Sequence, residues 1–260
     1  MLKIRQCLFH IAVALSPILA FAEPVDSSAA PARAAAPEMA QPRREEPPAV
    51  EIADPLQPVN RAVFAFNDRF QRWLLEPAAR GYARVVPEPG RRGLANMFRH
   101  LNTPTRLANC LLQGEPKQAV VEVERFIVNS VFGVLGFGDP AADRGLVSSP
   151  RDFGQTLGVY GLPPTFAITW PLLGASNLRD SLGIVGDSFL DPWRYARFGG
   201  GVQGGARGTR IVNDTSLRLG LYERIKQAAD DPYIEFRNQY ERRRQGMFET
   251  GRGGRAPQPE

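Results

Sequence analysis

The chain contains very little cysteine or histidine. Its 260 residues include two cysteines and two histidines. Because Cys7 and His10 fall in a segment that we interpret below as a removable leader, only Cys110 and His100 remain for the folded protein. One thiol cannot form an intrachain disulfide, and one imidazole cannot build a histidine zinc site. The sequence therefore predicts no disulfide framework, no metal site and no cofactor.

Long apolar runs and strand patterns are also scarce. The apolar stretch at 8–21 is interrupted by His10 and Pro17 and is short for a membrane span. No segment shows sustained alternation of apolar and polar residues beside turn-forming pairs, which is the usual strand pattern. We therefore predict an all-α domain.

The first 22 residues have the features of a secretory signal peptide. Lys3 and Arg5 precede the apolar stretch, and Ala20-Phe21-Ala22 is an A-x-A cleavage site, so cleavage is expected after Ala22. The alternative, a buried N-terminal helix, is less favoured because no partner pattern follows. Without these residues the chain keeps 30 Lys and Arg against 27 Asp and Glu, a mild excess that does not indicate nucleic-acid binding.

Residues 23–50 are predicted to form a disordered linker. Six prolines and eight alanines occupy these positions, with few large apolar residues to offset the loss of chain entropy on folding. The segment could be a tether between a membrane attachment and a globular body, or a tail without that role. The body is expected at 51–248, followed by a disordered tail at 249–260.

Helical periodicity dominates the body. Apolar residues follow a helical stripe from 59 to 74, and Asn60, Phe64, Asn67 and Gln71 share a neighbouring face. Pro77 is expected to end this helix, and Ser176 is expected to be the N-cap of a later one. Further helices are predicted at 90–101, 104–114, 116–135, 209–229 and 232–247, with a glycine-rich gap at 199–208.

The predicted helix at 116–135 is apolar around most of its circumference. Its polar exceptions form one narrow stripe at steps of four, three and four residues: Gln118, Glu122, Arg125 and Asn129. Such a helix lies either in a protein core or in lipid. In the core interpretation the stripe would be a satisfied buried network, with Glu122 and Arg125 paired at i, i+3.

These motifs resemble the MlaA (VacJ) family, the outer-membrane component of a bacterial phospholipid-transport system. The resemblance runs from about Asp54 to about Arg244 and rests on five groups of residues in order. They are Asp54-Pro55-Leu56 with Asn60-Arg61 and Phe66-Asn67; Asn96 with Leu101-Asn102-Thr103-Pro104, then Asn109 and Leu112-Gln113-Gly114; Arg125-Phe126, Asn129, Gly133, Gly136-Phe137 and Asp139-Pro140-Ala141; Phe153 to Gly158 with Tyr160-Gly161; and Leu172, Gly174, Ser176 and Leu178-Arg179-Asp180.

The resemblance implies a ring of amphipathic helices in the inner leaflet of the outer membrane, with a central amphipathic pore. It also implies phospholipids as cargo, a porin trimer and a soluble periplasmic lipid carrier as partners, and no covalent chemistry. We expect the protein to remove mislocalised phospholipid from the outer leaflet and so maintain lipid asymmetry. Candidate residues at the pore or its opening are Asn60, Phe66, Asn67, Glu122, Arg125, Asn129, Arg179 and Asp180.

The sequence departs from the family pattern in two places. Cys7 follows Arg5-Gln6 and is not placed as a lipobox cysteine, so attachment to the membrane is expected to rest on the helices and a porin. The stretch Leu162-Pro163-Pro164-Thr165-Phe166 replaces a glycine-rich one, and Ala175 stands where proline is typical. These changes concern local loop shape.

Two other functions remain as hypotheses. A porin-associated envelope protein that moves no lipid would have the same sequence features. A periplasmic hydrolase would have to use His100 with a serine and an acid, and no G-x-S-x-G nucleophile elbow is present.

Overall fold

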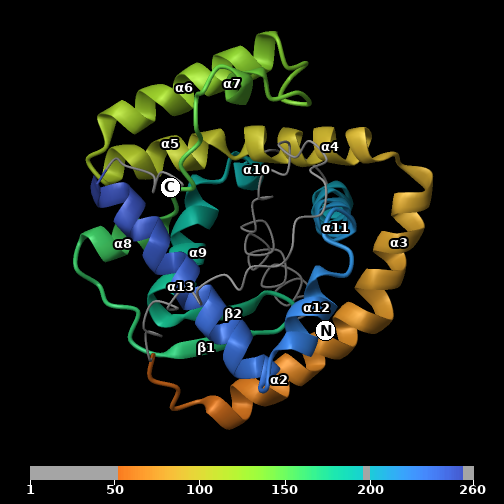
Figure 1. Ribbon diagram of the computed structural model, residues 1–260. Coiled ribbons are helices and arrows are strands. Elements are labelled where there is room, and N and C mark those ends of the chain that lie inside the picture. The colour runs from red at the N-terminus through yellow and green to blue at the C-terminus, as the bar shows by residue number, and fades with distance from the viewer. Residues whose placement is uncertain (1–51, 196–199, 254–260) are drawn as a thin grey trace, which may run out of the picture.

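The computed structural model describes residues 52–195 and 200–253 (Figure 1). The predicted signal peptide, its cleavage site, the linker and the end of the tail lie outside these residues. The described chain is helical apart from one small sheet, which confirms the all-α prediction. The helices are α2 Gln57–Phe70, the π-helix η2 Gln71–Leu75, α3 Glu76–Val85, α4 Glu88–Leu101, α5 Thr103–Leu112, α6 Pro116–Val131, α7 Pro140–Asp143, α8 Phe153–Val159, α9 Leu178–Leu190, α10 Pro192–Tyr195, α11 Gly200–Ser216, α12 Leu221–Ala228 and α13 Pro232–Gly253.

The chain from Gln57 to Val85 is one helical path. The prediction that Pro77 ends the first helix is wrong, because the π-helical turn η2 separates α2 from α3 and Pro77 falls in the first turn of α3. A proline is tolerated there, since the N–H that it lacks would have no helical partner. The widened turn thus lets the path continue through a proline that would otherwise break it.

Helix ends follow the expected residues in most places. Pro104 and Pro116 lie in the first turns of α5 and α6, and Gly114 adopts the left-handed φ of 72° after α5. Helix α6 ends at Val131, before the predicted Leu135, because Val134 and Leu135 take positive φ values of 53° and 56°. These left-handed residues cannot continue a right-handed helix.

Several predicted boundaries in the second half of the body are wrong. The helix predicted at 209–229 is interrupted, because α11 ends at Ser216 and α12 begins at Leu221, and α13 continues past the predicted end at 247 to Gly253. The N-cap of α9 is Asn177, which accepts the N–H of Asp180 at 2.8 Å, in place of Ser176. Helix α11 begins at Gly200, inside the stretch predicted as a gap. Packing against α3 and α4 compensates for the poor helix propensity of its glycines. Asn213 holds this contact by donating to the carbonyl of Arg91 at 3.0 Å and accepting from the hydroxyl of Tyr82 at 3.1 Å.

The sheet is an antiparallel hairpin of β1 Ala167–Trp170 and β2 Gly174–Asn177. Four residues per strand are too few for an alternating pattern to be visible in the sequence. Asn60 of α2 replaces a third strand at its edge, because its amide donates to the carbonyl of Ala167 at 3.1 Å and accepts the N–H of Thr169 at 2.8 Å.

The helices follow the periphery of the view in Figure 1. The path α2–α3 and then α4 form successive sides, α5 continues α4, and α6 and α7 lie outside α5 and α4 at the top. Helix α11 packs inside α3 and α4, and α8 packs on α9. Helix α13 crosses the face of the molecule beside the hairpin and α9.

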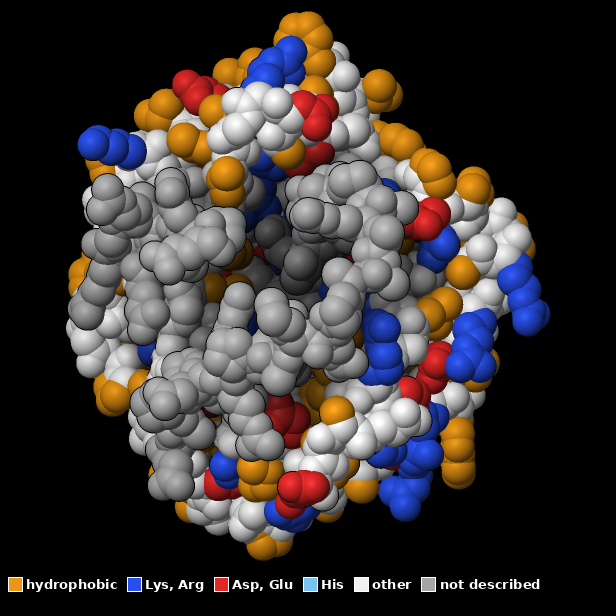
Figure 2. Space-filling model, viewed as in Figure 1, with side chains coloured by type: hydrophobic (Ala, Val, Ile, Leu, Met, Phe, Trp, Pro, Cys, Tyr) orange, Lys and Arg blue, Asp and Glu red, His pale blue; other side chains and the backbone are white. Residues whose placement is uncertain are grey.

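The buried residues are mainly polar and the exposed ones include many large apolar side chains. Glu122, Asn109 and Asn177 are completely buried and Gln155 is almost so, whereas Trp73 is 76% exposed. Figure 2 shows hydrophobic side chains along the outer edge, including the edge formed by α6 and α7. Among the described residues, no helix combines the length and the apolar character that crossing a membrane requires. The fold is therefore inverted relative to a water-soluble protein.

Gly183 permits the close contact between α8 and α9. A Cβ at position 183 would lie 2.5 Å from the Cα of Gly154, against backbone that cannot rotate away. We expect Gly183→Ala to lower the free energy of unfolding by about 1–3 kcal/mol, the usual cost of overpacking. Thermal unfolding of the detergent-solubilised protein measures this effect.

Gly204→Ala in α11 is the matched control, because nothing lies within 4 Å of a Cβ at that position. Alanine there should leave stability unchanged or raise it by up to about 1 kcal/mol through helix propensity. Equal melting temperatures for the two variants would contradict the proposed α8–α9 contact.

Candidate functional site

The polar stripe of α6 faces inward. Ala119, Glu122, Arg125 and Asn129 are buried, while the apolar residues of the helix point outward. Glu122 accepts hydrogen bonds from Arg106 Nε at 2.9 Å, from the hydroxyl of Ser148 at 2.8 Å and from the N–H of Ser149 at 3.0 Å. The expected pair of Glu122 with Arg125 is therefore wrong: Glu122 bonds to α5 and to the segment after α7.

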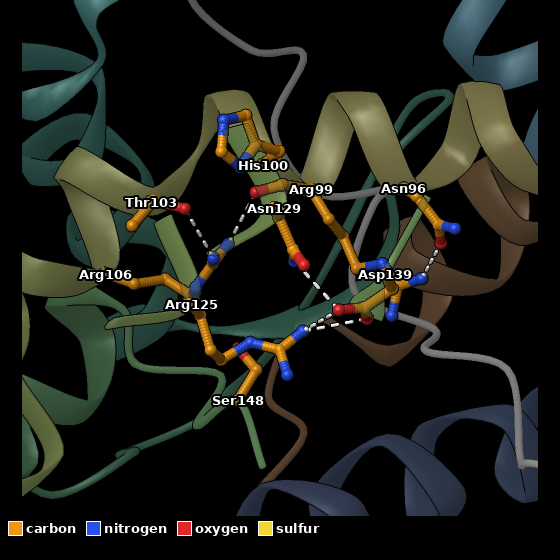
Figure 3. A pocket seen from close by; sticks show the side chains of 9 residues that line it. All are labelled: Asn96, Arg99, His100, Thr103, Arg106, Arg125, Asn129, Asp139 and Ser148. Atoms are coloured by element: carbon orange, nitrogen blue, oxygen red, sulfur yellow. Dashed lines mark hydrogen bonds and ion pairs between the residues drawn. The ribbon is translucent and has the colours of Figure 1, made fainter. Parts of the chain in front are cut away.

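Arg125 and Asn129 both bind Asp139, immediately before α7 (Figure 3). Arg125 Nη2 donates to both carboxylate oxygens, at 2.9 and 2.8 Å, and Asn129 donates to Oδ1 at 2.8 Å. Burial raises the pKa of Asp139, but these hydrogen bonds outweigh it, so the net pKa is lowered. Asn129 also accepts the N–H of Ala141 at 3.0 Å, which fixes the chain as it enters α7.

The pocket in Figure 3 has a volume of about 20 Å³, which is room for about one water molecule. Its lining is polar and includes three arginines and one carboxylate: Asn96, Arg99, His100, Thr103, Arg106, Arg125, Asn129, Asp139 and Ser148. Arg125 and Asn129 thus share one small polar cavity, and this cavity has no space for a lipid or for a hydrolase substrate.

His100 lies within hydrogen-bond distance of a serine, but no substrate-sized pocket adjoins the pair. Its Nε2 lies 3.1 Å from the hydroxyl of Ser130, and its ring stacks on Phe126 with centroids 4.6 Å apart. Burial and the nearby charge of Arg106 lower the pKa of His100. The pair therefore resembles a nucleophile and base only in its hydrogen bond, since the adjoining pocket cannot hold a substrate.

The opening motif connects α2 to the hairpin. Asn60 binds β1 as described and also donates to Asp54 at 2.8 Å. Asn67 donates to the carbonyl of Trp170 at 2.9 Å and accepts the N–H of Leu172 at 2.7 Å, which holds the hairpin turn. Phe66 is half exposed and stacks on Phe70.

Asp180 is the centre of a buried charge cluster between α8, α9 and α13. Arg179 Nε lies 3.1 Å from Asp180, so the expected local pairing is present. The larger contribution comes from α13, where Arg244 donates to both oxygens at 2.8 and 2.7 Å and also binds Asp152. Arg179 also lies over the ring of Phe248 at 4.5 Å. Although burial raises the pKa of Asp180, the two arginines lower it overall.

A much larger cavity, of about 810 Å³, lies between α2, η2, the hairpin and the three C-terminal helices. Asn67 lines it, and the other sequence-predicted site residues are not among its lining. The lining combines apolar and basic side chains: Phe64, Phe70, Leu75, Leu172, Leu173, Leu221, Ile225, Phe236 and Met247 with Arg218, Arg237, Arg242 and Arg243.

The sequence indicated only one wall of this cavity. Asn60, Phe64, Asn67 and Gln71 were predicted to share a face. The last three line the cavity, whereas Asn60 is buried against β1. The sequence did not predict that the basic residues of α13 face this cavity, because spacing within a helix does not show which distant helix packs opposite it. A missed clue was the presence of two aromatic residues and three arginines within one stretch of α13, at 236–243.

These features define a class of protein: a helical, polar-cored protein with an apolar exterior and an amphipathic internal cavity. The model of the MlaA lipoprotein family matches residues 52–247, and the chain belongs to that family. It is 37% identical over 202 residues to the intermembrane phospholipid transport system lipoprotein MlaA of Haemophilus influenzae, covering 73% of this chain and 77% of the relative.

One further relative and one solved structure support the same family assignment. The MlaA protein of Escherichia coli K12 is 31% identical over 195 residues, covering 72% of this chain and 75% of the relative. A solved structure described as the structural basis for maintenance of bacterial outer membrane lipid asymmetry matches with a TM-score of 0.63 and 28% identity, covering 75% of this chain and 99% of that chain. The resemblance seen in the sequence is thereby confirmed.

Asp187 introduces a pH dependence into the α8–α9 contact. Its Oδ1 accepts from Asn109 at 2.8 Å and from the N–H of Phe153 at 3.1 Å. Burial, and then the negative charge of Asp152, raise the pKa of Asp187 to about 7. Because the folded-state pKa exceeds the ordinary value of 3.8, this group's stabilising effect is full below about pH 4 and is lost as the pH rises through 7.

We expect Asp187→Asn to remove this dependence. An amide oxygen in the Oδ1 position can accept both hydrogen bonds without becoming charged. Wild-type unfolding free energy should fall between pH 5 and 7.5 by at most about 1.4 kcal/mol per pH unit, and the variant should lose less. Chemical denaturation at several pH values measures both slopes. Parallel curves would show that Asp187 does not titrate in this range.

Proposed function

We propose that this protein transports phospholipid at the outer membrane, removing mislocalised phospholipid from the outer leaflet and so maintaining lipid asymmetry. The observation that carries the proposal is the inverted arrangement of polar and apolar residues. Membership in the MlaA family and the names of its relatives support it.

The apolar exterior of α5 and α6 suits a lipid environment. Leu111, Phe126, Ile127 and Val131 are all at least 42% exposed, and other large apolar residues continue this surface to Leu135. A surface of this kind is unfavourable in water but costs nothing against acyl chains. We propose that these helices lie along the inner leaflet of the outer membrane, with this apolar surface in contact with acyl chains.

The large cavity supplies a route for an amphipathic molecule. A phospholipid has a charged headgroup that is costly to move through hydrocarbon and tails that are costly to expose to water. The cavity of about 810 Å³ presents basic and apolar side chains together. We propose that the peripheral helices form a ring and that this cavity is part of a central amphipathic pore.

The residues selected from the sequence then have distinct roles in the proposal. Asn67 would line the pore and, with Asn60, hold the hairpin that forms part of its wall. Phe66 would contact lipid outside it. Glu122, Arg125 and Asn129 would stabilise the α6 edge of the ring, and Arg179 with Asp180 would fix α9 against α13.

A porin trimer, a soluble periplasmic lipid carrier and the outer-membrane inner leaflet complete the proposed assembly, with the protein on the periplasmic side of the membrane. The function needs no covalent chemistry and no nucleic acid. The transport proposal is favoured over a porin-associated protein without transport activity because such a protein has no need for an amphipathic cavity. It is favoured over a hydrolase because the Ser130–His100 pair adjoins no substrate-sized space.

The exterior of α6 provides a direct test of membrane attachment. Ile127 and Val131 are 55% and 67% exposed, one helical turn apart. We expect the double variant Ile127→Lys/Val131→Lys to shift protein from the membrane to the soluble fraction, since each lysine in lipid costs about 2–3 kcal/mol. Flotation with vesicles of outer-membrane lipid measures the shift. Gln227→Lys on α12 is the control, and equal flotation of all three proteins would contradict this membrane surface.

Deletion of the gene tests transport itself. Phospholipid in the outer leaflet should increase, as measured with a labelling enzyme that reaches only the cell surface, and the wild-type gene should reverse the increase. No change on deletion would remove the transport proposal and favour the structural alternative. A His100→Ala gene should complement as well as the wild type, and its failure at normal protein level would favour the hydrolase.

A further inference from the structure

The outer face of the path from α2 through η2 to α3 combines basic and apolar side chains. All five arginines of the path are exposed, whereas its two carboxylates, Asp68 and Glu76, are buried. The exposed arginines are Arg61, Arg69, Arg72, Arg80 and Arg84. Large apolar side chains are exposed among them: Val59, Phe66, Trp73, Leu74 and Val85. Figure 2 shows such a mixture of basic and hydrophobic side chains along the edge that α3 forms in Figure 1.

These residues are not the ones that line the large cavity. The path contributes a different set to the cavity lining: Phe64, Asn67, Phe70, Gln71 and Leu75. On the exposed side, Val59, Phe66 and Trp73 follow at steps of seven residues, and Arg69 lies between the last two. Because such steps return to one side of a helix, one stripe carries aliphatic, aromatic and cationic groups together.

The net charge of the protein is concentrated in the same part of the chain. Residues 57–101, from α2 to α4, contain eight arginines and three acidic residues, an excess of five. The whole chain has a net charge of +5, so the charges of the other residues cancel. A negatively charged partner would therefore be attracted to this side of the molecule.

Two of the exposed arginines have no acidic partner among the described residues. Arg72 and Arg80 each form an ion pair with a buried carboxylate one helical turn earlier. In contrast, Arg69 donates to the carbonyl of Ala65 at 3.3 Å, and within residues 52–195 and 200–253 no ion pair links Arg69 or Arg84 to a carboxylate. Both guanidinium groups are exposed, so an anionic group can approach each of them.

The headgroup layer of a membrane suits both kinds of side chain. Anionic phosphates attract arginines near the surface, and an arginine stem can lie along apolar groups while its guanidinium reaches a phosphate. Tryptophan favours the same depth, because its ring is apolar and its N–H is polar. A nucleic acid or a purely acidic protein surface would pair with the arginines and leave Trp73, which is 76% exposed, in water.

We propose that the outer face of α2, η2 and α3 binds the headgroup layer of an anionic phospholipid leaflet, with Arg69 and Arg84 at lipid phosphates and Trp73 at the boundary with the acyl chains. This inference rests on the proposed membrane function. It adds a lipid class at a second edge of the molecule, where the contact is with headgroups, whereas the exterior of α6 contacts acyl chains.

The test measures flotation of the full-length protein, diluted from detergent onto vesicles of phosphatidylcholine alone or with one part in four of phosphatidylglycerol. We expect wild-type protein to bind the anionic vesicles about tenfold more tightly, and the difference to shrink in concentrated salt. The double variant Arg69→Gln/Arg84→Gln should lose most of this difference and still bind neutral vesicles. Arg69→Lys/Arg84→Lys should retain most of it, because the charges remain.

The matched control is Arg194→Gln/Arg224→Gln, which removes two exposed arginines of α10 and α12. It changes the net charge by the same amount and should leave the preference for anionic vesicles unchanged. If the two glutamine double variants lower it equally, general charge explains the preference and the inference fails. Thermal unfolding of each variant shows that only folded proteins are compared.

The depth of Trp73 gives a second, independent measurement. Spin-labelled lipids quench tryptophan fluorescence at close range, and the part of the quenching that is lost in Trp73→Phe belongs to Trp73. We expect a label at the headgroup to quench this part more than a label at the middle of an acyl chain. Stronger quenching by the mid-chain label would place Trp73 among acyl chains and overturn the headgroup assignment.

The remaining outcomes separate this inference from the proposed function. Equal binding of wild-type protein to both kinds of vesicle would overturn the inference and leave apolar attachment through α6 intact. Absence of binding to either kind would overturn both. A preference for anionic vesicles that survives in Arg69→Gln/Arg84→Gln would contradict the inference and favour an acidic protein as the partner of this face. The deletion experiment tests transport separately, because it does not depend on the headgroup charge.

Discussion

The structure depends on the burial of polar side chains by helices whose apolar faces point outward. Helix α6 shows the constraint most clearly, since Glu122 is fully enclosed while Ile127 and Val131 are exposed. A buried carboxylate is strongly unfavourable unless it is neutralised and hydrogen-bonded. Glu122 meets this requirement with Arg106, Ser148 and Ser149, so the same contacts that satisfy the charge also place α5 and the segment after α7.

The other side of the molecule uses the same kind of contact over longer sequence separations. Arg244 binds Asp152 and Asp180, which are 92 and 64 residues away along the chain. Burying a guanidinium is costly, but this one is enclosed by two carboxylates, which together raise its pKa well above the ordinary value. Removal of any one partner would leave an uncompensated buried charge. Specific geometry therefore takes the place of an apolar core in joining α8, α9 and α13.

Sequence periodicity was sufficient to predict most helices and the polar stripe of α6, because side-chain spacing reports directly on which residues share a face. It could not show whether that stripe faced water, lipid or protein. The wrong pairing of Glu122 with Arg125 illustrates the reason: spacing within a helix shows that two residues are near, but a partner on another helix can bind better. The passage through Pro77 was missed because it depends on a π-helical turn that has no strong sequence pattern.

The large cavity was the least predictable feature, since it requires elements from both ends of the described chain. Phe64 and Gln71 enter it from α2 and η2, whereas Arg243 enters from α13. In a water-soluble protein, a cavity of this size would forfeit much of the hydrophobic stabilisation of the core. Here the buried contacts that hold the helices are ion-pair and amide networks, such as those of Asn60, Glu122 and Asp180, and none of these three residues lines the cavity. A polar-cored fold can therefore keep an open interior at little cost, and in the proposed membrane setting its apolar surface would be stabilised by lipid.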